Sequence, residues 1–151
     1  MKSLRITAAL ALVLLPCLAL AACGDGDRAE RLKAAGPNPS LHALMRVADA
    51  DAGARTFGQC LACHTIGKGE LDRAGPNLHG IMGKPVAGGS ARYGYTAALE
   101  RVGGRWDQAT MNRWLTSPQR FAPGTKMTFP GLADPLARAD VIAYLEREGR
   151  E

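Results

Sequence analysis

Apolar residues occur as one unbroken run near the start of the chain and as short periodic groups after it. Residues 6–22 contain no charged residue, whereas the rest of the chain mixes apolar and charged positions. In that later part, apolar residues recur at the three- and four-residue spacing of a helix face, and no segment alternates as a half-buried strand does. Helices are predicted over residues 40–48, 51–60, 95–102, 107–117 and 134–149. The pattern therefore predicts an all-α fold.

Two of these helices have clear start signals, and long loops separate the elements. Asp107 and Asp134 are the expected N-caps. Residues 65–94 are rich in glycine and lack sustained periodicity, so they are expected to form a loop with at most a short helix at residues 78–82. Residues 121–131 are expected to be a second loop. Loops of this length are uncommon unless they serve a function.

The apolar run at the N-terminus has the layout of a secretory signal peptide. Lys2 and Arg5 precede it, Pro16 interrupts it, and small side chains end it. The run has 17 residues, which is short for a membrane-spanning helix, although an uncleaved anchor is the alternative. Residues 1–22 are therefore predicted to be a signal peptide.

The end of this run resembles the lipobox of bacterial lipoproteins, through the residues Leu20-Ala21-Ala22-Cys23. In such proteins the cysteine carries the lipid and becomes the first residue of the mature chain. Ordinary cleavage is the alternative, but it leaves Cys23 as a lone thiol in an oxidising compartment. The resemblance therefore implies a protein of the bacterial periplasm that is anchored to a membrane through a lipid on Cys23.

The mature chain divides into a polar linker and one domain. Residues 23–39 are small and polar and contain Gly36 and Pro37, so they are predicted to be a flexible tether in which no core forms. Residues 40–151 are enough for one domain. Only 5% of the chain is aromatic, so something other than large side chains is expected to fill the core of this domain.

The charge of the chain argues against nucleic-acid binding. Removing Lys2 and Arg5 with the signal peptide leaves 17 basic and 14 acidic residues. The basic residues are scattered, without a run of five or six and without interleaved aromatic side chains. These charges are interpreted as a solvated surface.

One motif carries recognisable chemistry, Cys60-Leu61-Ala62-Cys63-His64. It is the C-x-x-C-H sequence of haem attachment, in which two thiols bond to the haem vinyl groups and the histidine reaches the iron. A structural disulfide, a thioredoxin-like pair and half of a zinc site are the alternatives. The thioredoxin pair requires a βαβ setting, and a zinc site requires four ligands, for which only His42 and His79 remain as nitrogen donors. We therefore predict one haem c, bound covalently through Cys60 and Cys63, whose flat apolar body fills the core.

Six pieces of the stretch from Gly53 to Gly149 follow one another in a characteristic order and spacing. They are Gly53-x-x-x-Phe57-x-x-Cys60-x-x-Cys63-His64, Gly75-Pro76-Asn77-Leu78-His79-Gly80, Tyr95-Thr96, Trp106, Pro123-Gly124-Thr125-Lys126-Met127 and Ile142-Ala143-Tyr144-Leu145. Through these pieces the stretch resembles the class I c-type cytochromes, the family of mitochondrial cytochrome c. The resemblance implies the cytochrome c fold, with several helices and long loops around one haem.

The resemblance implies two axial ligands of the iron. His64 would be the first, and Met127 the second, with a soft thioether that favours ferrous iron and raises the reduction potential. Pro76 would accept a hydrogen bond from His64 Nδ1 through its carbonyl, which fixes the tautomer and makes the iron-bound nitrogen a better donor.

Further residues receive roles from the same resemblance. Tyr95 and Trp106 would donate hydrogen bonds to a haem propionate. Trp114 stands in the haem pocket where many members have tyrosine, and Leu99 where most have asparagine, so a reduced polar network is expected beside the methionine. Gly53 and Phe57 are expected to cross the last helix near Val141 and Tyr144.

A haem with histidine and methionine ligands has no open position for a substrate, so the expected function is electron transfer and not catalysis. The expected partners are redox proteins that bind transiently, together with the membrane through the N-terminal lipid, and the protein is expected to be a monomer. If Met127 does not bind iron, a five-coordinate haem would make the protein a sensor or a peroxide-reducing enzyme. If no haem is attached, the chain would be a structural or zinc-binding lipoprotein.

Overall fold

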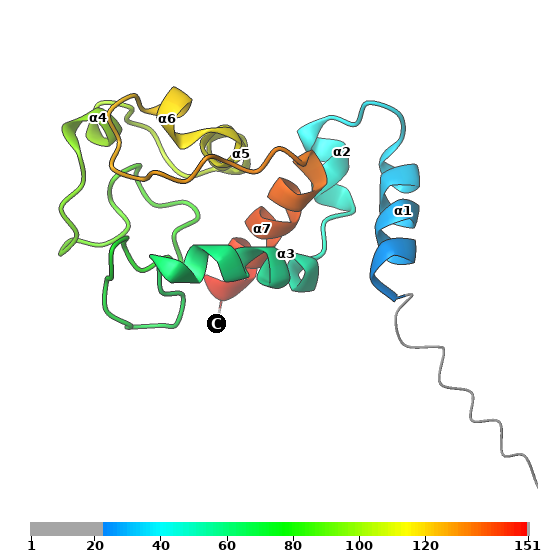
Figure 1. Cartoon of the computed structure of the whole chain (residues 1–151), viewed down its shortest axis with the longest axis horizontal. Coiled ribbons are helices and arrows are strands. Elements are labelled where there is room, and N and C mark those ends of the chain that lie inside the picture. Colours follow the sequence, from blue (N-terminus) through cyan, green and yellow to red (C-terminus); the bar gives the residue numbers. More distant parts are fainter. Residues whose placement is uncertain (1–22, 151) are drawn as a thin grey trace, which may run out of the picture.

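The computed structural model describes residues 23–150, and the predicted signal peptide therefore lies outside the described residues. Within this range the chain is helical, with no strand and one isolated bridge between Pro85 and Arg105. The helices are α1 (Cys23–Ala35), α2 (Leu41–Arg46), α3 (Ala50–Phe57), the 3-10 helix η1 (Gly58–Ala62), α4 (Ala97–Glu100), α5 (Gln108–Thr116), α6 (Pro118–Phe121) and α7 (Pro135–Glu148), as Figure 1 shows. Over the same range, no helix has both the length and the apolar character that a membrane crossing requires.

The structure confirms the all-α prediction, and a helix lies in each of the five predicted stretches. The predicted N-caps are also correct, because Asp107 Oδ1 accepts from Thr110 N at 2.7 Å and Asp134 Oδ1 accepts from Leu136 N at 3.0 Å. The second expected loop differs at its start, since the short helix α6 includes Phe121. Pro118 at the first turn of α6 explains this helix, because its fixed φ and missing N–H suit a helix start.

The helices α3 and α7 cross in close contact near the middle of the domain. A Cβ atom on Gly53 would lie 2.0 Å from the carbonyl oxygen of Asp140, so only glycine allows this approach. The rings of Phe57 and Tyr144 pack beside this crossing, with their centres 5.1 Å apart. The expected pairing of Gly53 and Phe57 with the last helix is therefore present, with the backbone of Asp140 at the point of closest approach.

A core of apolar side chains joins α5 and α7 to the loops. Trp106, Trp114 and Phe121 form an aromatic cluster in this core, with ring centres 5.6 to 5.9 Å apart. The buried members of the core are Phe57, Ile81, Val86, Leu99, Trp106, Met111, Trp114, Leu115, Ala122, Val141, Ile142, Tyr144 and Leu145. This core places α5, α7 and the two long loops around one shared interior.

The prediction of a flexible tether over residues 23–39 is wrong for the part that forms α1. Leu32 and Ala35 on α1 pack against a second apolar cluster formed by Leu44, Leu136 and Ala139. The polar composition of the segment led to the tether prediction, but its middle is made of strong helix formers. A core does form there, and α1 stands beside α2 at one edge of the molecule (Figure 1).

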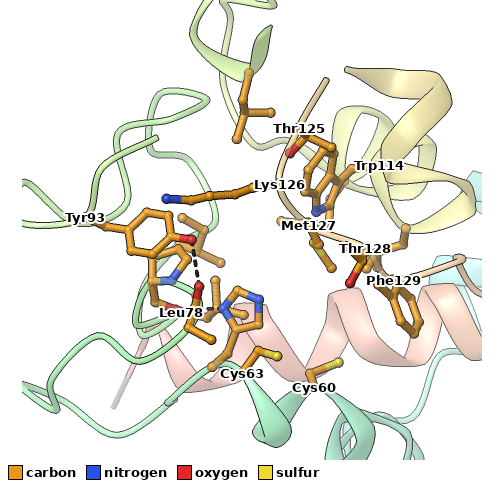
Figure 2. Close-up of a pocket in the computed structure, with 18 of the residues that line it drawn as sticks. Cys60, Cys63, Leu78, Tyr93, Trp114, Thr125, Lys126, Met127, Thr128 and Phe129 are labelled. Carbon is orange, nitrogen blue, oxygen red and sulfur yellow. Dashed lines mark hydrogen bonds between the residues drawn. The ribbon is translucent and has the colours of Figure 1, made fainter. Parts of the chain in front are cut away.

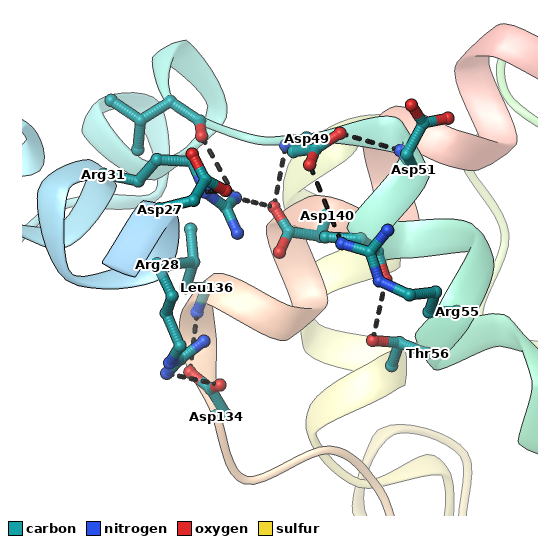
Figure 3. Close-up of polar contacts among 12 residues, drawn as sticks. Asp27, Arg28, Arg31, Asp49, Asp51, Arg55, Thr56, Asp134, Leu136 and Asp140 are labelled. Carbon is teal, nitrogen blue, oxygen red and sulfur yellow. Dashed lines mark hydrogen bonds and ion pairs between the residues drawn. The ribbon is translucent and has the colours of Figure 1, made fainter. Parts of the chain in front are cut away.

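Ion pairs also attach α1 to the domain (Figure 3). Arg31 Nη1 lies 2.7 Å from Asp140 Oδ1 on α7, and the backbone N–H of Asp49 donates to the same oxygen at 2.8 Å. The Asp140 side chain is 4% exposed, so its charge is compensated almost wholly by protein groups. Arg28 adds a more exposed pair with Asp134 at 2.7 Å. The helix α1 is therefore part of the folded domain.

Candidate functional site

A cavity of about 520 Å³ lies in the interior of the domain, a size typical of a site for an organic ligand. Its walls come from both long loops and from α4, α5 and α7, and most of its lining side chains are apolar (Figure 2). The apolar residues of this lining include Leu78, Ile81, Leu99, Met111, Leu115, Phe129, Val141 and Leu145. The cavity therefore suits a large apolar group that the chain itself does not provide.

Two cysteine thiols line one side of this cavity. Cys60 lies in η1 and Cys63 directly follows it, and the turn is closed by hydrogen bonds to Cys60 O from Cys63 N at 3.0 Å and from His64 N at 2.9 Å. Both cysteines are free thiols, so they do not form the structural disulfide considered above. Burial, with a smaller contribution from Cys63, raises the pKa of Cys60 to about 11. The turn thus presents both thiols to the cavity (Figure 2).

His64 follows the second cysteine and also lines the cavity. Its Nδ1 atom lies 2.8 Å from the carbonyl oxygen of Pro76, which is the contact that the family resemblance implied. A carbonyl only accepts, so Nδ1 carries the proton and Nε2 is left with a free lone pair. Burial lowers the pKa of His64, although the Pro76 hydrogen bond opposes this effect, and the ring is therefore neutral at pH 7. A neutral, oriented imidazole is the form that binds a metal.

Gly75 lies against the face of the His64 ring. A Cβ atom at this position would be 2.4 Å from His64 Cε1, so any side chain larger than hydrogen would displace the imidazole. The Gly75 N–H also donates to Cys63 O at 2.7 Å. The glycine in the Gly75-Pro76 pair therefore lets the loop approach and fix the histidine, a role that the motif alone does not reveal.

Met127 lines the cavity from the loop between α6 and α7. Figure 2 shows its side chain on the opposite side of the cavity from Cys60 and Cys63. The turn before it is closed by a hydrogen bond from Thr125 N to Ala122 O at 2.9 Å, and Gly124 in this turn has a φ of +93°. The local Pro-Gly-Thr sequence therefore forms a tight turn that directs the Met127 segment toward the cavity.

Lys126 and Tyr93 connect the two loops at the rim of the cavity. The Lys126 ammonium lies 4.2 Å from the centre of the Tyr93 ring and donates a hydrogen bond to Gly94 O. The Tyr93 hydroxyl donates to Ala74 O at 2.8 Å, beside the loop that holds His64. Sequence reasoning missed Tyr93, because no local pattern shows that it pairs with a lysine 33 residues later.

Polar donors line the otherwise apolar cavity. The Tyr95 hydroxyl accepts from Ser90 N at 3.0 Å, and burial is the main reason that its pKa is raised, so it keeps its proton at pH 7. Trp106 and Trp114 are buried and line the same cavity. Among residues 23–150, neither indole N–H makes a hydrogen bond to the protein, and the Tyr95 hydroxyl donates none. The cavity therefore offers donors to a ligand that carries acceptors.

These groups fit a covalently attached haem. Two free thiols, one oriented imidazole and one thioether face an apolar cavity, and hydrogen-bond donors are available for haem carboxylates. The zinc alternative has less support, since no group of three or more His, Cys, Asp or Glu side chains comes together in the described part of the chain. The structure thus brings Cys60, Cys63, His64, Tyr95, Trp106, Trp114 and Met127 to one cavity, with Pro76 lining it and oriented toward His64.

Comparisons with known proteins give a consistent result. The cytochrome c family model matches residues 50–147 of the chain. Cytochrome c of Cannabis sativa is 42% identical over 99 residues, which cover 65% of this chain and 88% of that protein. Cytochrome c2 of Rhodoblastus acidophilus is 42% identical over 99 residues, which cover 66% of this chain and 92% of that protein.

A solved structure shares the same fold. Cytochrome cH from Methylobacterium extorquens superposes with a TM-score of 0.62 at 42% sequence identity. The match covers 66% of this chain and 98% of that protein. The family model begins at residue 50, so α1 and α2 lie entirely outside the part of the chain that it matches.

Proposed function

Because the chain belongs to the cytochrome c family, we propose that it is a one-electron carrier whose haem iron is bound by His64 and Met127. Members of this family are electron carriers and not enzymes, and they hold one c-type haem covalently. Cys60 and Cys63 are the attachment thiols of this chain. The partners are redox proteins that donate and accept the electron.

The observation that supports His/Met ligation most directly is that one cavity is lined by both a neutral imidazole and a thioether. His64 follows Cys63, its Nδ1 proton is engaged by Pro76, and its Nε2 is left free. Met127 faces the cavity from the side opposite to the cysteines. When bound between these residues, a haem would supply one-electron chemistry at its iron. The chain's part is to hold these ligands still and to exclude water.

The remaining residues of the site position and shield the group. Tyr95 and Trp106 would donate hydrogen bonds to the propionates of a bound haem, which would offset the cost of burying carboxylates. Trp114 and the apolar lining keep water from the ligands, which lowers the local dielectric constant. Leu99 is buried and lines the cavity with an apolar side chain, so this position gives Met127 no polar partner.

We further propose that the protein acts in the bacterial periplasm as a monomer and is attached to a membrane by a lipid on Cys23. The lipobox sequence supports this proposal, together with the bacterial relatives. To test this proposal, Cys23 is replaced by serine in the full chain. The wild-type protein should partition with membranes, and the Cys23→Ser protein should be recovered in the soluble fraction with its haem. Recovery of both proteins in the soluble fraction would contradict lipid attachment.

The ligation proposal is tested with the full chain produced alongside a haem-attachment system. Haem that survives denaturing extraction identifies the covalent bond, and carbon monoxide added to the native ferrous protein identifies an open iron position. We expect covalent haem that does not bind carbon monoxide, and a Met127→Ala variant that does. Binding of carbon monoxide by the wild-type protein would remove Met127 as a ligand and favour a five-coordinate sensor or a peroxide-reducing enzyme.

A further inference from the structure

The segment that carries Met127 has little support from its own backbone. Within the described chain, residues 126–131 take part in no hydrogen bond between backbone groups. The nearest such bonds are from Thr125 N to Ala122 O at 2.9 Å and from Leu132 N to Leu115 O at 2.7 Å. Met127 therefore lies in a stretch whose ends are fixed but whose middle must be held by side chains.

The side chain of Gln119 provides this support. Its Nε2 atom lies 2.9 Å from Thr125 O and 3.0 Å from Met127 O. Both neighbours are carbonyl oxygens, which only accept hydrogen bonds, so the NH2 group of the carboxamide must face them. Its two hydrogens then have one acceptor each. One amide group thus bridges the carbonyls on either side of Lys126.

Gln119 reaches the loop from a fixed base. It lies in α6, where Pro118 is fully buried and Phe121 packs against Trp106 and Trp114 with ring centres 5.9 and 5.6 Å apart. Ala122, directly after this helix, is 1% exposed. Because α6 cannot shift without breaking these contacts, the carboxamide of Gln119 holds the loop against a rigid part of the core.

We propose that Gln119 is a positioning residue for Met127, and that its carboxamide sets how often the thioether leaves the iron. The inference rests on the proposed function, because it requires Met127 to be a ligand. Gln119 does not line the cavity, so it acts only through the two loop carbonyls. Lys126 fastens the same segment toward Gly94 on the other loop, which leaves Gln119 as the contact on the α6 side.

The size of the effect follows from the exposure of the contact. Gln119 is exposed and water can replace a lost hydrogen bond, so each bond contributes at the low end of the usual range. Loss of both bonds is expected to raise the population with Met127 detached by roughly fivefold to tenfold. Any external ligand that needs the vacated position then binds more tightly by the same factor.

Three variants of the full chain separate the positioning role of Gln119 from unrelated effects. Gln119→Ala removes the carboxamide. Gln119→Glu keeps the shape of the side chain, but its ionised carboxylate only accepts and is repelled by the two carbonyls, so its effect should be at least as large. Gln108→Ala is the matched control, because Gln108 also lies in a short helix and donates through Nε2, to Glu146 Oε1 at 2.8 Å, far from the loop in sequence.

The measurement is a titration of the ferric holoproteins with imidazole, which binds iron only after Met127 has left. The reaction is followed through the far-red absorption band of the methionine–iron bond. Hydrogen exchange of the Thr125 and Leu132 amides, whose hydrogen bonds fix the two ends of the segment, gives a second readout that does not depend on the iron. Gln119→Ala and Gln119→Glu should bind imidazole roughly fivefold to tenfold more tightly than wild type, and their Thr125 and Leu132 amides should exchange faster than in wild type. Gln108→Ala should match wild type in both measurements.

The possible failures are distinguishable. If Met127→Ala has the same absorption spectrum as the wild-type protein, Met127 is not a ligand, and the proposed function itself would fail. If Met127 is a ligand in the wild-type protein but both Gln119 variants bind imidazole within twofold of wild type, the positioning role of Gln119 alone would be overturned. An equal change in Gln108→Ala would also overturn it, because the effect would then reflect general destabilisation.

Discussion

The pair between Arg31 and Asp140 offers a sharp test of how α1 is joined to the domain. We consider Arg31→Met, which keeps much of the side-chain length and its apolar contacts but removes the guanidinium. The Asp140 carboxylate is 4% exposed, and from residues 23–150 it would keep only the hydrogen bond from Asp49 N, at 2.8 Å. The variant therefore leaves a buried negative charge without its counter-charge.

The cost can be worked out from this geometry. Removing one partner of a buried ion pair typically costs about 3–5 kcal/mol. The Arg31 side chain is 14% exposed, and α1 lies at the edge of the molecule, so water can reach Asp140 if the helix moves away. We therefore expect the free energy of unfolding to fall by about 2–3 kcal/mol. At a urea m-value of about 2 kcal/mol per molar, the midpoint should fall by roughly 1–1.5 M.

The assay is urea unfolding of the haem-loaded full chain, with Arg55→Met as the control. Arg55 lies 4.0 Å from Asp49 in the same polar cluster, but its side chain is 68% exposed, so its loss should change stability by about 0.5 kcal/mol or less. In an Asp140→Asn background, Arg31→Met should cost much less, because no charge is left to compensate. A coupling energy between the two changes below about 0.5 kcal/mol would refute the reasoning.

Two further predictions follow from the packing and from the polar loop contacts. Gly53→Ala should lower the free energy of unfolding by about 3 kcal/mol or more in urea, because the new Cβ would lie 2.0 Å from Asp140 O and force two helices apart. Hydrogen bonds from Asn77 N, and to a smaller extent from Ser90 Oγ, lower the pKa of Asp72. The ionised carboxylate therefore stabilises the fold above its unfolded pKa of about 3.9. This stabilisation is lost as the pH falls through the lower pKa of the folded state. Asp72→Asn should therefore reduce the loss of urea midpoint between pH 5 and pH 3.

Each of these predictions has a control and a result that would contradict it. Gly58→Ala should leave stability unchanged or slightly higher, because no atom lies within 4 Å of its new Cβ and its φ of −48° is helical. A Gly53→Ala protein as stable as Gly58→Ala would rule out the close crossing. Glu100→Gln, at an exposed position on α4, should keep the acid sensitivity of wild type. Equal acid profiles for Asp72→Asn and wild type would show that Asp72 carries no such linkage.

The helices and the chemistry of the motif could be predicted because their signals are local. The spacing of apolar residues and the caps at Asp107 and Asp134 placed the later helices close to their observed bounds. The Cys60-to-His64 motif predicted a haem site with two thiols and an imidazole, and the structure has a cavity that these three side chains line. Each of these signals lies within a few residues of the feature that it predicts.

The features that were missed depend on contacts between distant parts of the chain. Arg31 contacts Asp140, which lies 109 residues away in the sequence. The polar composition of residues 23–39 could not reveal this contact, so a tether was predicted where the structure has the docked helix α1. Gln119 lies only eight residues from Met127, but its role depends on how the turn after α6 folds back. Gly75 belongs to a recognised motif, yet its contact with His64 follows from loop packing and not from spacing.

The docking of α1 determines how the domain is presented if Cys23 is lipidated. The thirteen residues of α1, at 1.5 Å each, make a helix about 20 Å long. A flexible chain of the same number of residues would span about the same distance on average. The height above the bilayer is therefore nearly unchanged, but the freedom to tumble is not, because a helix joined to α7 turns only together with the domain. A membrane-bound redox partner would then meet the same face of the carrier at each encounter, and fewer encounters would fail through wrong orientation.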